Sequence, residues 1–488
     1  MADVDHINLH CYTQANMENE LEFAPATKIR QLVSDGEISP VELTEMFLSR
    51  IDSLDSHLNS YLTVTADRAL AAARVAEEAV LNGDHLGLLH GIPLSIKDLE
   101  MSAGVRTTGG SLLFEDRVPS VDSSVVQRVK SAGAIILGKT NTPEFGLLGH
   151  TQNRLGDHCR NPWNTDRTTG GSSGGAGAAV AAGLCSLATG SDGGGSIRIP
   201  ASFCGIYGIK PTQGRVPLYA GTPGTPFANH FSQSGPMSRT VKDSAILLQA
   251  LSGHDTNDVN SLRVAPGDYI AAADNDIGQL KIAWSPDYGY AAVEPEIISK
   301  CQQAVRVFEE LGCIVEDVDL DIKSPFEEFW TLFTAVSNAR YESLIGDNSD
   351  LLTDYGREAI ESGARVTGPQ YARALGIRAE LISRFGTIFD EYDLLVSPTL
   401  SVGAFTVGEP PTEIAGKPVH PFWGFLPFTY PINMIGNPAA SIPAGFTAEG
   451  LPIGLHIVGQ WGDEETVIAA SSAFENARPW NNIQPPIS

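Results

Sequence analysis

The chain has 488 residues, of which 58 are acidic and 32 are basic, so its formal net charge is −26 at neutral pH. A surface of this sign repels a phosphate backbone, and we expect no nucleic-acid partner. Hydrophobic residues make up 42% and charged residues 18% of the chain, a composition that excludes a disordered protein and predicts a large core.

Helical and strand-like patterns alternate along the chain. Ser39 and Pro40 form a helix-start signal, followed by apolar residues at helical spacing as far as Leu54. Further helices are predicted at 66–81, 123–131, 241–251 and 295–311, after Gly175, and across a largely helical segment at about 325–392. Strands are predicted at 91–97, 134–137, 184–188, 280–284, 313–318, 393–397 and 451–458. The alternation predicts an α/β fold with helices on both faces of a central sheet.

Targeting and cysteine patterns favour a reducing compartment. The first twenty residues lack the basic and apolar regions of a signal peptide, and no apolar run approaches the roughly 20 residues of a membrane span. The six cysteines lack the paired spacing of a zinc site or a disulfide framework: Cys11, Cys159, Cys185, Cys204, Cys301 and Cys313. We therefore expect a cytoplasmic protein with no membrane association, no metal and buried free thiols.

The segment 168–198 is rich in glycine and serine, and two simple interpretations of it are open. A glycine-rich turn entering a helix can bind phosphate, but this one lacks the lysine that ends a P-loop. Gly170-Gly-Ser172-Ser-Gly174 also fits the nucleophile elbow of an α/β-hydrolase, with Ser172 as nucleophile and a later Asp and His as partners. That elbow needs a strand running into its first glycine, whereas 160–169 is polar and the later histidines sit in no supporting motif.

A third interpretation uses two serines and a lysine together. Ser172 and Ser196 lie 24 residues apart in glycine-rich segments, and Lys97 ends a predicted buried strand 75 residues before Ser172. The chain resembles the amidase signature family over about residues 25–480. The matching segments are GIPLSIKD (91–98), GKTNTPEF (138–145), GGSSGG (170–175), GSDGGGSIRIPA (190–201), GIKPT (208–212), YPINMIGNPAASIP (430–443) and GLPIG (450–454).

The resemblance implies a fold, a reaction and a catalytic triad. The fold would be one domain over residues 1–488, with three α/β/α layers around a mixed β-sheet and the helical segment at about 325–392 covering the active-site face. Ser196 would be the acylated nucleophile, Ser172 a bridging serine preceded by a cis peptide bond, and Lys97 the base. A lysine acts as a base only when neutral, so burial must lower its pKa by several units. No cofactor is implied.

The loop around Ser196 would bind the developing oxyanion through main-chain N–H groups. The expected donors are Gly193, Gly194, Gly195 and Ser196, and the family usually has a larger residue at position 193. Supporting residues around the triad are expected to be Gly171, Ser173, Asp192 and Arg198.

The family fixes the reaction better than the substrate. The favoured substrates are aryl amides, anilides and aryl carbamates, with esters also considered, because an aromatic run suits an apolar group. Pocket candidates are Gly146, Phe329, Trp330, Phe333, Phe422, Trp423, Phe425 and Phe428. The alternative is the glutaminase subunit of a tRNA-dependent amidotransferase, which usually carries Met-Asp-Glu-Phe where this chain has Thr142-Pro-Glu-Phe145. The expected partner is a small-molecule amide or carbamate, and the protein would be a monomer or a homodimer.

Overall fold

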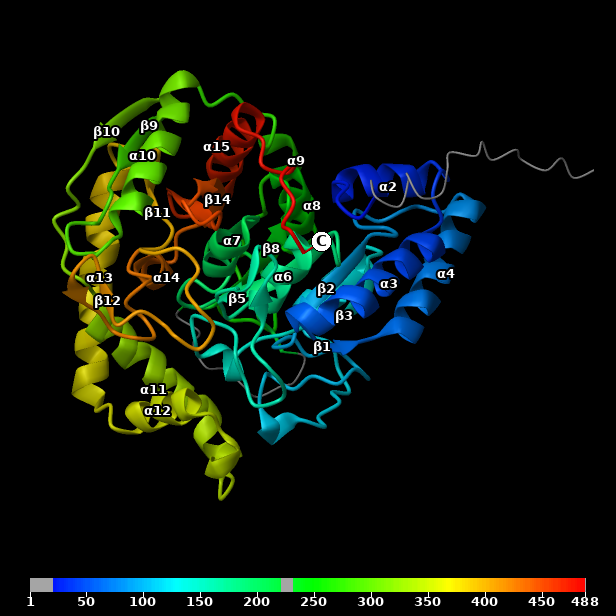
Figure 1. The fold of residues 1–488 in the computed structure, drawn as a ribbon, viewed down its shortest axis with the longest axis horizontal. Helices are drawn as coiled ribbons and strands as arrows, with labels where there is room; N and C mark the ends of the chain where they lie inside the picture. The colour runs from blue at the N-terminus through cyan, green and yellow to red at the C-terminus, as the bar shows by residue number, and fades with distance from the viewer. Residues whose placement is uncertain (1–20, 221–230, 488) are drawn as a thin grey trace, which may run out of the picture.

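The computed structural model describes residues 21–220 and 231–487, and Figure 1 shows the arrangement of its helices around a central sheet. The sheet has eleven strands in the order β1-β3-β2-β6-β8-β7-β14-β15-β11-β9-β10. In that order the strands are Tyr61–Val64, Ile135–Thr140, Pro93–Lys97, Leu187–Asp192, Gln233–Ser238, Tyr207–Lys210, Ala439–Phe446, Pro452–Gly459, Leu394–Pro398, Lys281–Trp284 and Ile314–Asp317. The sheet is mixed, as predicted: β2 is parallel to β3 and β6, β9 is parallel to β10 and β11, and the other pairs are antiparallel.

The α-helices that accompany the sheet are α2 to α15. Their bounds are Ala26–Ser34, Pro40–Leu58, Ala66–Asn82, Ser124–Ser131, Gly174–Ala181, Arg198–Cys204, Val241–Leu251, Tyr269–Ala272, Pro295–Glu310, Phe326–Ile345, Asp354–Ala364, Gly368–Phe389, Tyr430–Ile435 and Glu464–Ala477. The segment predicted to be helical at 325–392 contains α11, α12 and α13, which extend to the lower left in Figure 1.

Helices cover both faces of the sheet. Successive residues of a strand face opposite sides, and in β6 both sides carry apolar side chains that pack against helices. In β6, Leu187 belongs to the core cluster that includes Ala245 and Leu248 of α8. The next residue, Ala188, belongs to the cluster that includes Phe47 of α3 and Val180 of α6. All of these side chains are buried, so the sheet is packed between two helical layers.

The strands of the structure differ from the predicted ones in several places, and β1, β7, β8 and β14 of the central sheet were not predicted. The strand predicted at 134–137 continues to Thr140, and the one predicted at 184–188 begins at Leu187 and continues to Asp192. Both strands end in buried polar residues. Because the prediction followed apolar residues, it did not include these ends. The polar stretch 160–169 does contain strands, β4 (Arg160–Asn161) and β5 (Asn164–Thr168). They form a separate hairpin outside the central sheet, which needs no apolar run.

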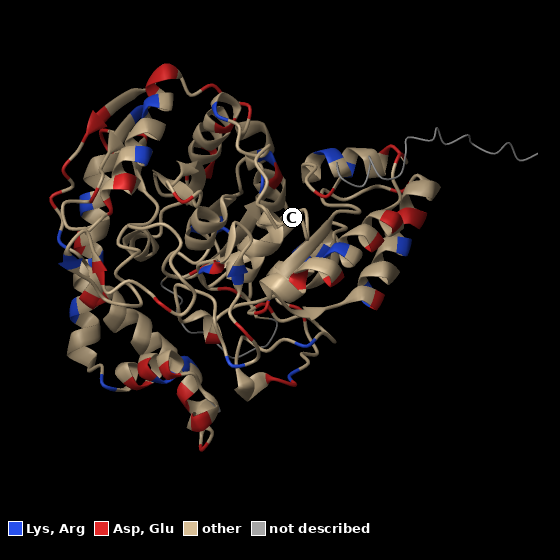
Figure 2. Cartoon of the chain, in the orientation of Figure 1, with Lys and Arg blue, Asp and Glu red and all other residues tan. Residues whose placement is uncertain are grey.

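Charge is concentrated at the periphery of the molecule. Figure 2 shows acidic residues along outer helices, α4, α10 and α12 among them. Within the described ranges, no helix is both long enough and apolar enough to cross a bilayer. The five cysteines there are all buried and free, and Cys11 lies outside the described residues. Lys97, Asp192 and Arg198 are among the charged side chains that are instead fully buried.

Candidate active site

Lys97 is the last residue of β2, and its side chain is fully buried. Its Nζ lies 2.7 Å from Ser172 Oγ and 2.8 Å from Ser173 Oγ. It also contacts Ser191, at 3.0 Å from the hydroxyl and 3.2 Å from the carbonyl oxygen. The amine is thus surrounded by neutral oxygen atoms, and among the described residues no carboxylate forms an ion pair with it.

Burial lowers the pKa of Lys97 from 10.5 to about 7, although the negative charges of Asp192 and Glu100 oppose the shift. The shift has the direction that the sequence analysis required for a base. A lysine with this pKa is largely neutral at slightly alkaline pH and can accept a proton from the neighbouring Ser172 hydroxyl.

Ser172 lies at the entry to α6, next to Lys97. The Gly171–Ser172 peptide bond is cis, as the resemblance implies. Neighbouring backbone comes so close that a Cβ at Gly171 would lie 2.7 Å from the His150 carbonyl carbon. A Cβ at Gly146, a predicted pocket residue, would lie 3.2 Å from Ser172 Oγ, so Gly146 borders the serine hydroxyl.

A lysine beside Ser172 contradicts the α/β-hydrolase alternative, in which a histidine would activate this serine. The strand that precedes it, β5, lies in the separate hairpin and not in the central sheet. The sequence motif of the elbow therefore occurs here without the preceding central strand and without the histidine that a nucleophile elbow requires.

Ser196 lies in the loop between β6 and α7, and its exposed fraction is 8%. The main-chain N–H of Ser173 donates to the Ser196 carbonyl oxygen at 3.1 Å. Ser173 thus forms hydrogen bonds with both Lys97 and the Ser196 loop. The segments that carry the three residues of the predicted triad are therefore joined by hydrogen bonds.

The Asp192 carboxylate holds the Ser196 loop from behind. It accepts the N–H of Gly195 at 2.7 Å and that of Ile197 at 3.2 Å. Arg198 forms a two-pronged ion pair with it, at 2.9 and 3.0 Å. Although burial opposes ionisation, the Arg198 guanidinium keeps the pKa of Asp192 below its usual value. Through these contacts the Asp192–Arg198 pair lies directly behind the loop.

The predicted nest of N–H groups requires one correction. The N–H of Gly195 donates to the Asp192 carboxylate, so it is not free to bind an oxyanion in this structure. In the part of the chain that the structure describes, the N–H groups of Gly193, Gly194 and Ser196 donate to no protein acceptor. A charged carboxylate is a stronger acceptor than a neutral oxygen, so this hydrogen bond holds the Gly195 N–H toward Asp192.

Sequence reasoning did not identify Thr429 and Asn433, which complete this support. Thr429 Oγ1 donates to the Gly194 carbonyl oxygen at 2.7 Å. The Asn433 amide donates to the Asp192 carboxylate at 2.8 Å and accepts from Arg198 at 2.6 Å. Asn433 belongs to the matching segment 430–443, so the resemblance marked the segment without indicating the contact.

His456 forms a hydrogen bond with Arg198. Its Nε2 lies 2.9 Å from Nη1 of Arg198, and burial, together with the arginine charge, lowers the pKa of the ring. At Nε2 the neutral ring accepts a hydrogen bond from the Arg198 N–H. Within the described ranges, no group of three or more His, Cys, Asp or Glu side chains is arranged to bind a metal ion.

Four predicted pocket residues gather on one side of the Ser196 loop. A Cβ at Gly194 would lie 3.1 Å from both Phe329 and Trp423. The ring centroid of Trp423 lies 5.3, 5.9 and 5.2 Å from those of Phe329, Trp330 and Phe333. We call these four side chains, Phe329, Trp330, Phe333 and Trp423, the aromatic wall.

Phe425 and Phe428 are buried in the same core cluster as Phe329 and Trp423, but their rings pack against other residues. Phe425 is fully buried, with its ring centroid 5.1 Å from Phe405 and 6.1 Å from Phe203. Phe428 is fully buried with its ring 5.0 Å from Tyr288. Sequence alone does not separate Phe425 and Phe428 from Trp423 of the wall, because all three belong to one aromatic-rich run.

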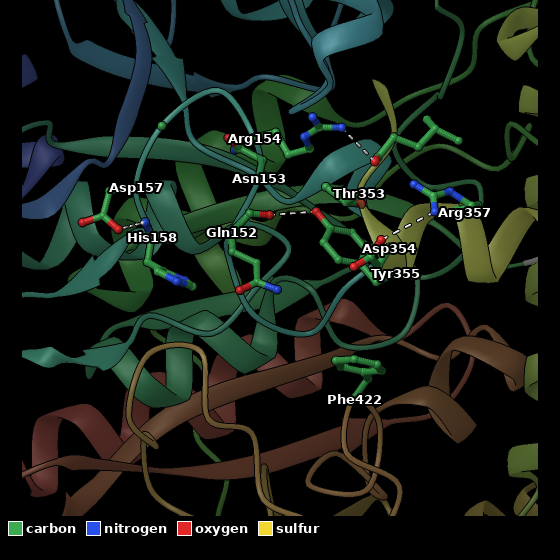
Figure 3. Close-up of a pocket in the computed structure, with 12 residues that line it drawn as sticks. Gln152, Asn153, Arg154, Asp157, His158, Thr353, Asp354, Tyr355, Arg357 and Phe422 are labelled. Atoms are coloured by element: carbon green, nitrogen blue, oxygen red, sulfur yellow. Dashed lines mark hydrogen bonds and ion pairs between the residues drawn. The ribbon is translucent and has the colours of Figure 1, made fainter. Parts of the chain in front are cut away.

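Phe422 lines a separate cavity of about 600 Å³, shown in Figure 3. The cavity lies between the loop at 152–158 and the first turn of α12, and Phe422 lies at its lower side in the view. The other lining residues are Gln152, Asn153, Arg154, Gly156, Asp157, His158, Leu352, Thr353, Asp354, Tyr355 and Arg357. Lys97, Ser172 and Ser196 do not line it, so it neighbours the site without containing it.

Comparisons with known proteins identify the family of the chain. The family model described as Amidase matches residues 42–468. An acylamidase of Rhodococcus erythropolis is 37% identical over 96% of this chain and 98% of its own length. A glutamyl-tRNA(Gln) amidotransferase subunit of Moorella thermoacetica is 39% identical over 96% of this chain and 99% of its own length.

A solved structure of a bacterial aryl acylamidase of the amidase signature family superposes with a TM-score of 0.89 at 34% identity, covering 94% of this chain and 97% of the other. Sequence and fold thus agree over nearly the whole length of the chain. The chain belongs to the amidase signature family and is an amide-hydrolysing enzyme.

Proposed function

We propose that the enzyme hydrolyses aryl amides, anilides and aryl carbamates through an acyl-enzyme on Ser196, with Lys97 as base and Ser172 as proton relay. The observation that carries the proposal is the 2.7 Å contact between Ser172 and a buried lysine whose pKa is about 7. Such a lysine can exchange a proton with the serine near neutral pH, which an ordinary lysine cannot do.

Acylation follows from this arrangement. Ser196 Oγ bonds to the carbonyl carbon while its proton passes to Ser172, and the Ser172 proton passes to the Lys97 amine. The N–H groups of Gly193 and Gly194 donate to the developing oxyanion, which stabilises it in a site with little water. The C–N bond then breaks as the proton returns through Ser172 to the leaving nitrogen, giving a free amine and an ester on Ser196.

Deacylation repeats the path with water as the nucleophile. Water attacks the ester while its proton passes through Ser172 to Lys97. The intermediate then collapses, the Ser196 oxygen recovers a proton, and the acid is released. The same lysine thus serves as base and as acid in both halves of the reaction.

The aromatic wall supports an apolar aryl group on the substrate. Phe329 and Trp423 border Gly194, so a group bonded to the reacting carbonyl would lie against their rings. Aromatic rings favour offset or edge-to-face packing with another ring, worth about 0.5–1.5 kcal/mol beyond burial. Carbamates and esters place the same carbonyl in the same position, and we include them on that ground.

The second candidate function is the glutaminase subunit of a tRNA-dependent amidotransferase. The similarity to the Moorella thermoacetica amidotransferase protein, 39% identical over nearly full length, favours it. Turnover of glutamine that requires a partner protein would identify that function, whereas turnover of an anilide by the isolated chain would contradict it.

The test is steady-state hydrolysis of a para-nitroanilide, an aryl carbamate and glutamine by wild type, Ser196→Ala and Lys97→Ala. We expect anilide turnover by the wild type and its loss, by at least about a thousandfold, in both variants. Labelling with a fluorophosphonate, which reacts with activated serines, should occur in the wild type and be absent in Ser196→Ala. Anilide turnover that survives Lys97→Ala would overturn the mechanism.

A further inference from the structure

A buried carboxylate outside the proposed triad joins the catalytic region to α12. Glu144 is fully buried, and in the described parts of the chain no lysine, arginine or histidine forms an ion pair with it. Its Oε1 accepts from the Ser111 hydroxyl at 2.6 Å. Its Oε2 accepts from the N–H of Thr353 at 2.7 Å and from the Thr353 hydroxyl at 2.6 Å. A buried carboxylate that is satisfied only by neutral donors is sensitive to the loss of any one of them.

Tyr355 makes a second connection in the first turn of α12. Its hydroxyl accepts the main-chain N–H of Glu144 at 2.7 Å and donates to the Gln152 carbonyl oxygen at 2.7 Å. Figure 3 shows the Tyr355–Gln152 contact at the cavity. One hydroxyl thus bridges two points of the segment 144–152, while Thr353 also caps the helix by accepting from Gly356 at 3.1 Å. We call Glu144, Thr353 and Tyr355 the α12 latch.

The segment that the α12 latch holds encloses Ser172. Gly146, two residues after Glu144, borders the Ser172 hydroxyl. Two residues before Gln152, the backbone of His150 packs against Gly171. Thr151 donates its hydroxyl proton to the Gly170 carbonyl oxygen at 2.9 Å. The residues next to each latch contact are therefore those that confine the bridging serine and the peptide that precedes it.

The turn itself has a backbone that must be held in place. Phe145 has φ of 54°, in the left-handed region that residues other than glycine rarely adopt. Its N–H donates to the Gly109 carbonyl oxygen at 2.7 Å, and its ring stacks on Tyr341 of α11 at a centroid distance of 4.1 Å. Such conformations persist where surrounding contacts determine them. Contacts with α11 and α12 thus hold this turn beside Ser172.

We propose that Glu144, Thr353 and Tyr355 are positioning residues for the reaction: the α12 latch orients the segment around Ser172 and thereby controls proton transfer to the leaving nitrogen. This inference rests on the proposed function of Ser172 as a relay. A displaced relay slows amide cleavage, because an amine leaves only after protonation. An aryl ester with a good leaving group does not need that proton, so its cleavage depends less on the relay.

The experiment compares a para-nitroanilide with a para-nitrophenyl ester of the same acyl group. In Tyr355→Phe and Thr353→Val we expect kcat/KM for the anilide to fall about tenfold and the ratio of anilide to ester kcat/KM to fall about fivefold or more. Thr353→Ser keeps the hydroxyl and should restore the wild-type ratio. The loss should appear in kcat more than in KM, because these groups do not bind the acyl portion.

The matched control is Tyr290→Phe, which removes a 2.7 Å hydrogen bond to the Pro427 carbonyl oxygen on another part of the structure. It should leave the anilide-to-ester ratio unchanged even where thermal stability falls. Latch variants that lose stability but keep the wild-type ratio, or that lose both activities in proportion, would overturn the inference.

Failure of the proposed function gives a different pattern. Wild-type protein that cleaves neither probe, or a Ser196→Ala variant that keeps wild-type turnover, would overturn the proposed function and the role of the latch together. Ser196-dependent turnover with an unchanged ratio in Tyr355→Phe and Thr353→Val would overturn the latch alone.

Discussion

The Nζ of Lys97 lies 2.7 Å from the hydroxyl oxygen of Ser172, and neither side chain is more than 2% exposed. Removal of the amine from water lowers its pKa to about 7. The same burial that makes a charged lysine unfavourable therefore makes a neutral one available as a base.

The first prediction concerns the pH dependence of activity. Because the neutral amine is the active form, kcat/KM for an anilide should rise with pH, with a midpoint near 7, and level off above it. Steady-state rates between about pH 5 and pH 10 measure this. A midpoint near the ordinary lysine value, or a rate that falls as pH rises through 7, would contradict the proposed role of Lys97.

The second prediction concerns stability. The folded pKa of Lys97 lies below its ordinary value of 10.5, so the unfolded chain binds more protons between the two values. The cost of burying Lys97 is absent above about pH 10.5, grows as pH falls, and is complete below about pH 7. Lys97→Met should therefore gain stability over wild type as pH decreases through this range. Urea unfolding at several pH values checks it, with the exposed Lys417→Met as control.

The third prediction contrasts two glycines of the Ser196 loop. Gly195 has φ of 130°, and a Cβ there would lie 2.5 Å from Thr429 Oγ1 and 2.7 Å from Thr429 Cβ. Gly193 has no such φ, and the nearest atom to a Cβ there would be a hydroxyl oxygen, Ser232 Oγ at 2.8 Å, with the next nearest atom at 3.8 Å. Gly195→Ala should lose about 1–3 kcal/mol of stability and most activity, whereas Gly193→Ala should keep activity within about fivefold. Thermal melts and anilide kinetics of both variants decide this.

The fourth prediction concerns the ion pair behind the loop. Asp192→Asn leaves the fully buried Arg198 without its counter-charge, which should cost about 3–5 kcal/mol. Combining it with Arg198→Met removes both charges. The double variant should therefore lose less unfolding free energy than the sum of the losses in the two single variants. Urea denaturation of the four proteins measures the coupling, and strict additivity would show that the two residues do not interact.

Local features of the fold were predictable because their causes are local. Ser39 caps α3 by accepting from the N–H groups of Val41 and Glu42, as the Ser-Pro signal predicted. Apolar periodicity located the strand that ends at Lys97 within two residues at its start. Polar strand ends at Thr140 and Asp192 could not be read in this way, because their burial depends on the residues that meet them.

Some residues of the candidate site were likewise predictable from the sequence, and others were not. Lys97, Ser172 and Ser196 stand in short motifs, so the family resemblance picked them out before any geometry was known. The aromatic wall was only partly separable: Trp423 lies beside Gly194, whereas Phe425, two residues later, packs against Phe405 in the core. Both have the same hydrophobic character, and only their surroundings differ.

The sequence by itself determined the α/β pattern, the motif residues and the polar or apolar character of each segment, because these follow from neighbours along the chain. The tertiary structure alone decided that Gly195 donates to Asp192 and that Asn433 reaches the same carboxylate from 241 residues away. It also decided that Glu144 meets Thr353, 209 residues later. A hydrogen bond depends on distance in space, and the folded positions of α12 and α14 set those distances, with α12 packed on α11 and α14 packed on α13.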